Sequence, residues 1–271
     1  MQNKLGTLWL IGAGNMGGAL LKRWLAADIF ERAVIIDPAD TPPPAGAERR
    51  DSLAAADGTP DYIVLAVKPH IAAKATEGLA DRISDDTVTI SVMAGLGLET
   101  LGQMVGRGHV VRAMPNTPSQ IGEGVTGLYG ETLNEAERKN VARIFETVGD
   151  AHWLAQESDF DALTAVSGSG PAYVFRMVEA LSAAGEWAGL DAELARKLAR
   201  QTVIGAGALL ASDPRTAGEL RRAVTSPGGT TEAGLEALDE EPGLPAIMRN
   251  VVRAASQRSR ELAQQADSSA G

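Results

Sequence analysis

Cysteine is absent from the 271-residue sequence, and this absence excludes several kinds of chemistry. Without thiols the chain can form no disulfide framework, no thiolate metal site and no cysteine nucleophile. We expect no metal centre of any other kind. A chain that needs no disulfide also needs no oxidising compartment, so a reducing cytoplasm is the expected location.

Positive charge and aromatic rings are also scarce. The 35 acidic residues outnumber the 25 basic ones, which gives a formal net charge of -10 and a sequence pI near 4.9. Because such a surface repels nucleic acid and anionic membranes, we expect neither as a partner and expect a small-molecule substrate instead. Aromatic residues make up only 4%, whereas glycines number 30, which predicts closely packed helices.

Long apolar runs are missing as well. No stretch reaches the roughly 18–20 apolar residues that cross a bilayer. The charge-free segment from Leu5 to Leu21 comes nearest. Gly12, Gly14, Gly17 and Gly18 interrupt it, together with Asn15, at the spacing of a strand, a turn and a helix. We therefore do not expect a secretory leader or a membrane segment here.

The apolar residues that are present predict two domains of different class. Short apolar runs in the first half predict strands at Leu8–Ile11, Val34–Ile36, Tyr62–Val67, Val88–Val92 and His109–Arg112. They alternate with helical stretches such as Met16–Ala27 and Ile71–Ile83, which is typical of a parallel sheet with right-handed crossovers. From about Glu157 onward, Ala- and Leu-rich helical stretches replace the strands. We predict an α/β domain over residues 1–157 and an all-helical domain over residues 158–271.

A Gly-x-Gly-x-x-Gly motif follows the first predicted strand and opens the first predicted helix. In a dinucleotide site the first glycine makes the tight turn, the second lets backbone approach the pyrophosphate, and the third packs helix against strand. Glycines alone could mark a structural turn, but Asp37 ends the next strand 20 residues after Gly17, as a Rossmann-type domain requires. The expected cofactor contacts are Gly12, Ala13, Gly14, Asn15, Met16 and Gly17.

Two further segments bear on the cofactor. Asp37 is placed to accept hydrogen bonds from a ribose, which makes NADH usable and would repel the extra phosphate of NADPH, although a solvated strand-end acid is the alternative. Arg49 and Arg50 follow and could compensate, so NADPH or NADH stays open. At the end of another strand we expect contacts from Ala66, Val67, Lys68 and Pro69, although Lys68 could simply be a surface lysine.

Three further blocks, Met114–Pro118, Val166–Phe175 and Val224–Gly234, resemble those of pyrroline-5-carboxylate reductases. With the glycine motif and Ala66–Pro69 they make five ordered matches between residues 8 and 262. The resemblance implies reduction of L-1-pyrroline-5-carboxylate to L-proline by hydride transfer from NAD(P)H, the last step of proline biosynthesis. It also implies a homodimer interleaved through the helical domain, sometimes in a ring of dimers, and an active site between the nicotinamide and the Ser226–Thr231 loop.

The residues of that loop suit the chemistry. Pro227 and two glycines must turn sharply before Thr230 and Thr231 begin a helix, whose free amides and dipole can hold a carboxylate. An ordinary helix cap is the alternative. The resemblance makes Thr231 the candidate catalytic residue, with its hydroxyl hydrogen-bonded to the imine nitrogen. Substrate contacts are expected from Ser226, Gly228, Gly229, Thr230 and Thr231.

Two other functions remain as alternatives. A hydroxy-acid dehydrogenase of related fold needs a lysine about four residues after the Gly168–Gly170 turn, where Val174 stands. A protein that senses dinucleotide without catalysis would not need the Ser226–Thr231 loop. The predicted helical domain has no histidine or cysteine, and its one lysine is Lys197, so it has few side chains for acid-base catalysis. A protonated imine needs little such catalysis, because it brings its own activating proton.

Overall fold

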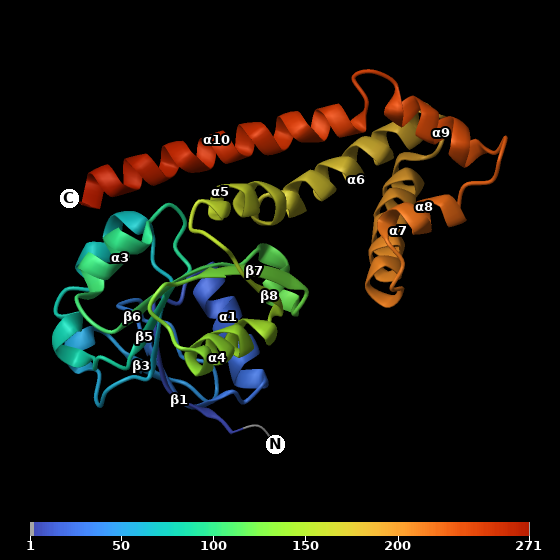
Figure 1. The fold of residues 1–271 in the computed structure, drawn as a ribbon. Helices are drawn as coiled ribbons and strands as arrows, with labels where there is room; N and C mark the ends of the chain where they lie inside the picture. Colours follow the sequence, from blue (N-terminus) through green and yellow to red (C-terminus); the bar gives the residue numbers. More distant parts are fainter. Residues whose placement is uncertain (1–2, 271) are drawn as a thin grey trace. The chain divides into compact units, whose positions relative to one another are not determined.

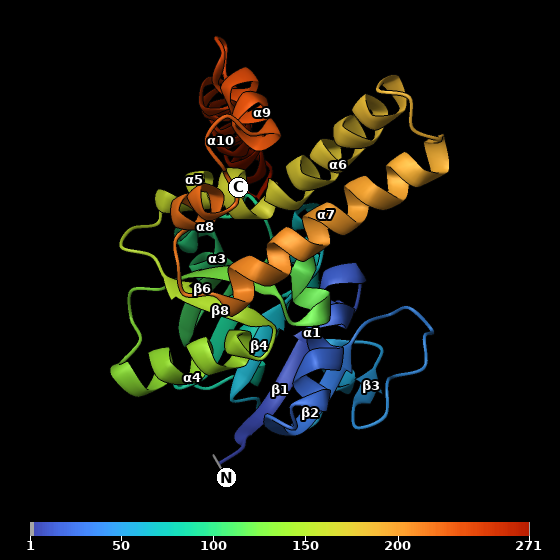
Figure 2. The same cartoon turned by 90° about the vertical axis from the view of Figure 1, so that its right-hand side faces the viewer.

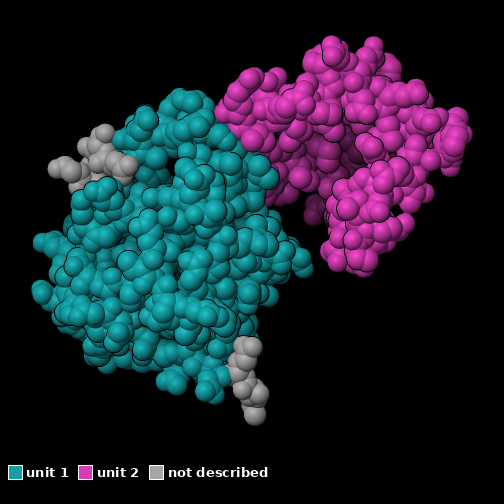
Figure 3. Space-filling model, viewed as in Figure 1, with its two compact units in different colours: residues 1–168, 255–271 teal, residues 169–254 magenta. Residues whose placement is uncertain are grey.

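The fold was obtained as a computed structural model that describes residues 3–270, with side chains to residue 266. Contacts between Cα atoms divide the chain into unit 1, residues 1–168 and 255–271, and unit 2, residues 169–254 (Figure 3). The domain boundary predicted between residues 157 and 158 remains a prediction. None of the helices in the described part is long and apolar enough to cross a membrane.

Unit 1 is built on an eight-stranded sheet in the order β3-β2-β1-β4-β5-β6-β7-β8 (Figure 1). Neighbouring strands are parallel except β6 and β7, which are antiparallel. The strands are β1 Leu5–Ile11, β2 Phe30–Ile36, β3 Glu48–Arg50, β4 Tyr62–Leu65, β5 Val88–Ser91, β6 His109–Met114, β7 Gly124–Tyr129 and β8 Gly149–Trp153. The predicted parallel α/β fold is therefore confirmed.

Helices cover both faces of this sheet, because side chains along a strand alternate between the faces (Figures 1 and 2). Leu8 and Leu10 of β1 pack with one helical layer, whereas Trp9 and Ile11 pack with the other. The first layer holds α1 Asn15–Ala26 and α4 Glu135–Glu146, which Trp24 joins through its indole N–H to the Ile144 carbonyl at 2.9 Å. The second layer holds α2 Ala72–Ala75 and α3 Leu98–Val105, and α5 Asp159–Leu163 completes the α-helices that lie wholly within unit 1.

The helical stretch predicted over Ile71–Ile83 is helical only in part and is not one continuous helix. The chain instead forms the 3-10 turn Pro69–Ile71, the short α2 and the 3-10 turn Leu79–Arg82. Gly78 has a φ of 76°, a left-handed conformation that ends regular helix here. Three strands were not predicted, because β3 is a charged edge strand and β7 and β8 lack a continuous apolar run.

Unit 2 is helical, as predicted for the second half of the chain. Its elements are α6 Gly170–Trp187, α7 Ala192–Ser212, α8 Ala217–Ala223, α9 Thr230–Asp239 and the start of α10 Leu244–Ala270, which continues into unit 1. Small residues let α6 and α7 approach closely, since a Cβ at Gly185 would lie 3.2 Å from the Ala195 Cβ. Large apolar side chains remain exposed in this unit, among them Phe175, Met177, Leu181, Trp187, Leu198 and Leu209.

An ion cluster at the outer edge of the sheet fixes β3 beside β2. The Arg32 guanidinium donates to both Glu48 carboxylate oxygens at 2.7 and 2.8 Å, and Arg50 donates to Glu48 as well. These hydrogen bonds from Arg32 lower the pKa of Glu48 from 4.5 to about 2. Ionised side chains of this kind also keep an open sheet edge from pairing with other chains.

We expect this cluster to make stability depend on pH in the acid range. A carboxyl whose folded pKa lies below its unfolded value stabilises the fold above the unfolded pKa, and this contribution is lost as pH falls through the folded value. The stability difference between wild type and Glu48→Gln, measured by urea unfolding, should therefore be constant above about pH 5 and shrink between pH 4.5 and 2. Glu77→Gln, at an exposed carboxylate elsewhere in unit 1, is the control. A difference that stays flat down to pH 2 would contradict this role.

Candidate dinucleotide and substrate sites

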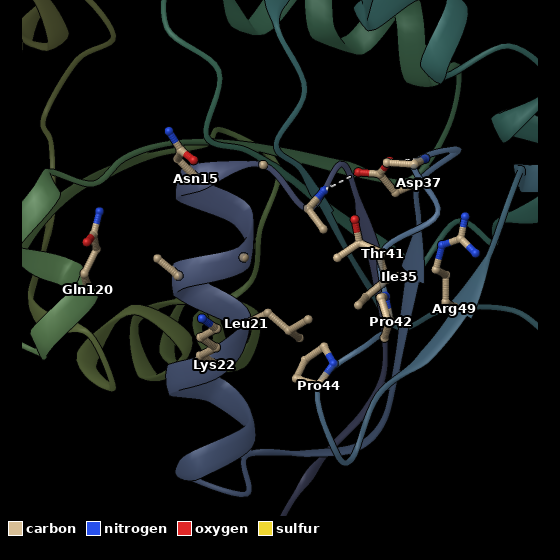
Figure 4. A pocket seen from close by; sticks show the side chains of 15 residues that line it. Asn15, Leu21, Lys22, Ile35, Asp37, Thr41, Pro42, Pro44, Arg49 and Gln120 are labelled. Carbon is tan, nitrogen blue, oxygen red and sulfur yellow. Dashed lines mark hydrogen bonds between the residues drawn. The ribbon is translucent and has the colours of Figure 1, made fainter.

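A cavity of about 970 Å³ opens in unit 1 beside the start of α1 (Figure 4). It contains four of the predicted cofactor residues: Ala13, Gly14, Asn15 and Asp37. They meet because β1 and β2 are parallel neighbours, so both strands end at the same edge of the sheet. Arg49, which the sequence named as able to compensate for Asp37, also lines the cavity. Residues that the sequence did not single out complete the wall, including Lys22, Thr41, Pro42, Pro44 and Gln120.

The three glycines of the motif have separate physical roles. Gly12 has a φ of +91°, and a Cβ there would lie 2.7 Å from a Val67 methyl and 2.9 Å from the Ala66 carbonyl. A Cβ at Gly17 would lie 2.4 Å from the Gly12 carbonyl, so this glycine lets α1 pack against the turn. In contrast, a Cβ at Gly14 would meet nothing within 4 Å. Gly12 and Gly17 therefore serve the fold, whereas Gly14 leaves space open at the cavity.

The start of α1 offers hydrogen-bond donors to an anion. Gly14 is the N-cap and makes no side-chain capping bond, and the first helical bond runs from the Gly18 N–H to the Gly14 carbonyl. The N–H groups of Asn15 and Met16 consequently have no partner within the helix, and the helix dipole adds partial positive charge there. Met16 packs its side chain against the core, so it can contribute to this site through backbone only.

Asp37 ties the glycine turn to the end of β2. One carboxylate oxygen accepts from the Ala13 N–H at 2.8 Å and the other accepts from the Ala39 N–H at 2.8 Å (Figure 4). Each oxygen has a second lone pair, so the carboxylate can still accept from a ligand hydroxyl. The sequence alone could place Asp37 near the turn but could not reveal this bridge.

The other predicted cofactor segment lies one strand away. The Ala66 N–H donates to the Ile11 carbonyl at 2.9 Å, and Ala66 and Val67 flank Gly12 as described. Lys68 is exposed and precedes the 3-10 turn that begins at Pro69. Lys68 and Pro69 do not line the 970 Å³ cavity.

Asn116 joins two of the segments that resemble known reductases. Its side-chain amide donates to the Ser167 carbonyl at 3.0 Å, and its carbonyl oxygen accepts from the Val125 N–H at 2.9 Å. Ser167 belongs to a π-helical turn, Thr164–Gly168, a rare conformation that often marks functional sites. This positioning role of Asn116 carries no short-range sequence signal, because its partners lie 9 and 51 residues away.

The predicted substrate loop belongs to unit 2 and forms a tight turn. Gly228 has a φ of +69°, and the Gly229 N–H donates to the Ser226 carbonyl at 3.0 Å. The Gly228 N–H donates to the Glu232 carboxylate at 2.6 Å. The loop is exposed at Ser226, Gly228, Thr230 and Thr231.

The predicted helix start at this loop is confirmed. α9 begins at Thr230, its N-cap is Gly229, and no side chain makes a capping hydrogen bond. The N–H groups of Thr230 and Thr231 lie in the first turn and have no partner within the helix. No threonine hydroxyl serves as the cap, so the loop is not explained by side-chain capping.

Two parts of the chain match models of known protein families. Residues 157–262 match the family model for pyrroline-5-carboxylate reductase dimerisation, and residues 7–95 match that for NADP oxidoreductase, coenzyme F420-dependent. A pyrroline-5-carboxylate reductase of Pseudomonas aeruginosa is 38% identical over 94% of this chain and 96% of its own length. One from Arabidopsis thaliana is 42% identical over 75% of this chain and 74% of its own.

Solved structures give the same result. A pyrroline-5-carboxylate reductase from Coxiella burnetii has a TM-score of 0.87 and 32% identity, and covers 94% of this chain and 97% of its own. The pyrroline carboxylate reductase of Plasmodium falciparum, solved with NADP bound, has a TM-score of 0.78 and 31% identity over 95% of this chain and 98% of its own. With such identity over nearly its whole length, the chain belongs to the pyrroline-5-carboxylate reductase family.

Proposed function

We propose that this chain reduces L-1-pyrroline-5-carboxylate to L-proline with hydride from NAD(P)H. The observation that carries the proposal is the 38% identity to a reductase of that name over 94% of the chain. The dinucleotide cavity and the Ser226–Thr231 loop supply the two binding functions that the reaction needs. The comparisons do not favour a hydroxy-acid dehydrogenase, and a protein that only senses dinucleotide would have no use for the loop.

The residues of unit 1 fit a dinucleotide. The amides of Asn15 and Met16 at the start of α1 would hold the pyrophosphate, and the open space at Gly14 admits it. Asp37 would accept from the adenosine ribose, which keeps NADH usable beside NADPH. Ala66, Val67, Lys68 and Pro69 would contact the nicotinamide half, since they follow β4, the neighbour of β1. The bound nicotinamide supplies the hydride.

The residues of unit 2 would hold the substrate. Because the Gly228 and Gly229 amides already have partners, the amides of Thr230 and Thr231 remain to bind the substrate carboxylate. The Thr231 hydroxyl would accept a hydrogen bond from the protonated imine nitrogen. Hydride addition to the imine carbon then turns the iminium into a neutral secondary amine, and no further proton is required. Thr231 orients the substrate and needs no unusual acidity.

The exposed apolar side chains of unit 2 support a homodimer. Trp187 is 90% exposed and Phe175 is 66% exposed, and both lie within the residues that match the dimerisation family. Large contiguous apolar surface is costly in water, and an obligate interface covers it as a core would. A ring of dimers is the larger assembly that we propose. A cytoplasmic location completes the proposal, because a chain without cysteine needs no oxidising compartment.

Purified protein should oxidise NADPH or NADH when pyrroline-5-carboxylate is added. The measurement is the loss of reduced-cofactor absorbance. In the comparison reaction, small hydroxy acids are supplied with oxidised cofactor, and a gain of the same absorbance would report turnover. We expect turnover in the first reaction and none in the second. If folded, cofactor-binding protein oxidises neither NADPH nor NADH when pyrroline-5-carboxylate is added, the proposed function is refuted.

Gly14→Ala should weaken cofactor binding without harming the fold. The added methyl group would enter space that is free of protein atoms but that the pyrophosphate has to approach. We expect the dissociation constant for NADPH, measured by calorimetry, to rise roughly tenfold, which corresponds to about 1.4 kcal/mol. Gly102→Ala is the matched control, because its Cβ also meets nothing within 4 Å but lies in α3, away from the cavity. If the two variants bind NADPH with equal affinity, the pyrophosphate does not bind at this turn.

Thr231→Ala should lower kcat by roughly one to three orders of magnitude, as expected when one oriented hydrogen-bonding group is lost. The dissociation constant for NADPH should hardly change, because the cofactor cavity lies in unit 1. Thr230→Ala is the control, since it removes the neighbouring hydroxyl and keeps the backbone amide. If Thr230→Ala proves the more damaging change in stable, cofactor-binding protein, the catalytic hydroxyl has been assigned to the wrong threonine.

A further inference from the structure

Arg49 places a guanidinium in the wall of the dinucleotide cavity. Figure 4 shows it projecting from β3 on the same side of the cavity as Asp37 and Thr41, across α1 from Gln120. Its side chain is only 19% exposed. Its Nε is buried and has no hydrogen-bond partner among the residues that the structure describes. A half-satisfied guanidinium facing a cavity is unexpected unless a ligand supplies the remaining acceptors.

The present partners of Arg49 are easily displaced. Its terminal nitrogens lie 3.5 Å from an Asp40 carboxylate oxygen and 3.0 Å from one of Asp51. Both carboxylates are highly exposed, and ion pairs of this kind contribute little free energy because water screens them. A dianionic phosphate offers stronger, charge-assisted hydrogen bonds to the same nitrogens.

Asp37 fixes where such a phosphate would lie. Its carboxylate is tied to the Ala13 and Ala39 amides, so it marks the end of β2, where the adenosine ribose is proposed to bind. Thr41 and Arg49 lie in the cavity wall just beyond that point, and both carry donors that suit a phosphate attached to the ribose. Arg50 does not share this environment, because it donates to Glu48 and Asp57 in the edge cluster.

We propose that Arg49 recognises the 2′-phosphate of NADPH and thereby sets the cofactor preference, with Asp40 and Asp51 holding the guanidinium when no phosphate is bound. The inference rests on the proposed function only for the identity of the cofactor. Asp37 then supports use of NADH, and Arg49 adds affinity that only the phosphorylated cofactor can use. Asp37 and Arg49 thus both act on the choice between NADH and NADPH, Asp37 in favour of NADH and Arg49 in favour of NADPH.

The test compares the binding of 2′,5′-ADP with that of 5′-AMP, two probes that differ only in the 2′-phosphate and require no turnover. Calorimetry at low salt on the full-length protein should give wild type an affinity for 2′,5′-ADP roughly ten- to hundredfold higher, as expected for charge-assisted hydrogen bonds. Arg49→Gln should lose most of this ratio, whereas Arg50→Gln, on the next residue of the same strand, should keep it. Asp40→Asn with Asp51→Asn should increase it.

Kinetics provide a second readout. Arg49→Gln should raise the KM for NADPH and leave kcat and the KM for NADH nearly unchanged, because NADH carries no group for Arg49 to hold. Equal binding of the two probes by wild type, or equal loss of the ratio in the Arg49 and Arg50 variants, would overturn the proposal. An Arg49-dependent ratio in protein that fails to reduce pyrroline-5-carboxylate would instead refute the proposed function and leave this inference standing.

Discussion

The structure depends on a constraint at one turn, where the backbones of β1, β4 and α1 approach too closely for any side chain. A Cβ at Gly17 would lie 2.4 Å from the Gly12 carbonyl, and one at Gly12 would meet Val67 and Ala66 within 3 Å. The same turn places the start of α1 beside the cavity and brings the Ala13 N–H to Asp37 at 2.8 Å. Packing and the proposed cofactor binding therefore both follow from the same glycine spacing.

The two binding functions of the proposed reaction rest mainly on the same kind of group, the backbone amide. In unit 1 the proposed donors are mostly backbone amides held by packed glycines, and Asp37 and Arg49 would add selectivity at the adenosine end. In unit 2 the loop before α9 would use backbone again. Internal hydrogen bonds at Gly228 and Gly229 occupy those amides, and the following two amides are the ones proposed to hold a carboxylate. Neither part needs a group of unusual acidity, which agrees with a substrate that arrives already protonated.

Local patterns in the sequence predicted the features that local physics controls. The glycine motif, the parallel strands that begin the sheet and the helix start at Thr230 all follow from neighbouring residues. Features that depend on distant pairing escaped prediction. Arg49 reaches the cavity only because a three-residue charged strand pairs with β2, and Asn116 finds its partners 9 and 51 residues away. The interrupted helical segment after Pro69 shows that composition alone does not predict a continuous helix. Residues 71–83 have helical composition, but Gly78 adopts a left-handed conformation that interrupts the helix.

The central claim is that hydride passes from a bound nicotinamide to the carbon of a cyclic imine. It is tested most directly by supplying NADPH that carries deuterium at the transferable position of nicotinamide C4, together with pyrroline-5-carboxylate, and analysing the proline by mass spectrometry and NMR. We expect one deuterium per proline, located at C5. Proline without deuterium, or deuterium at any other carbon, would contradict it.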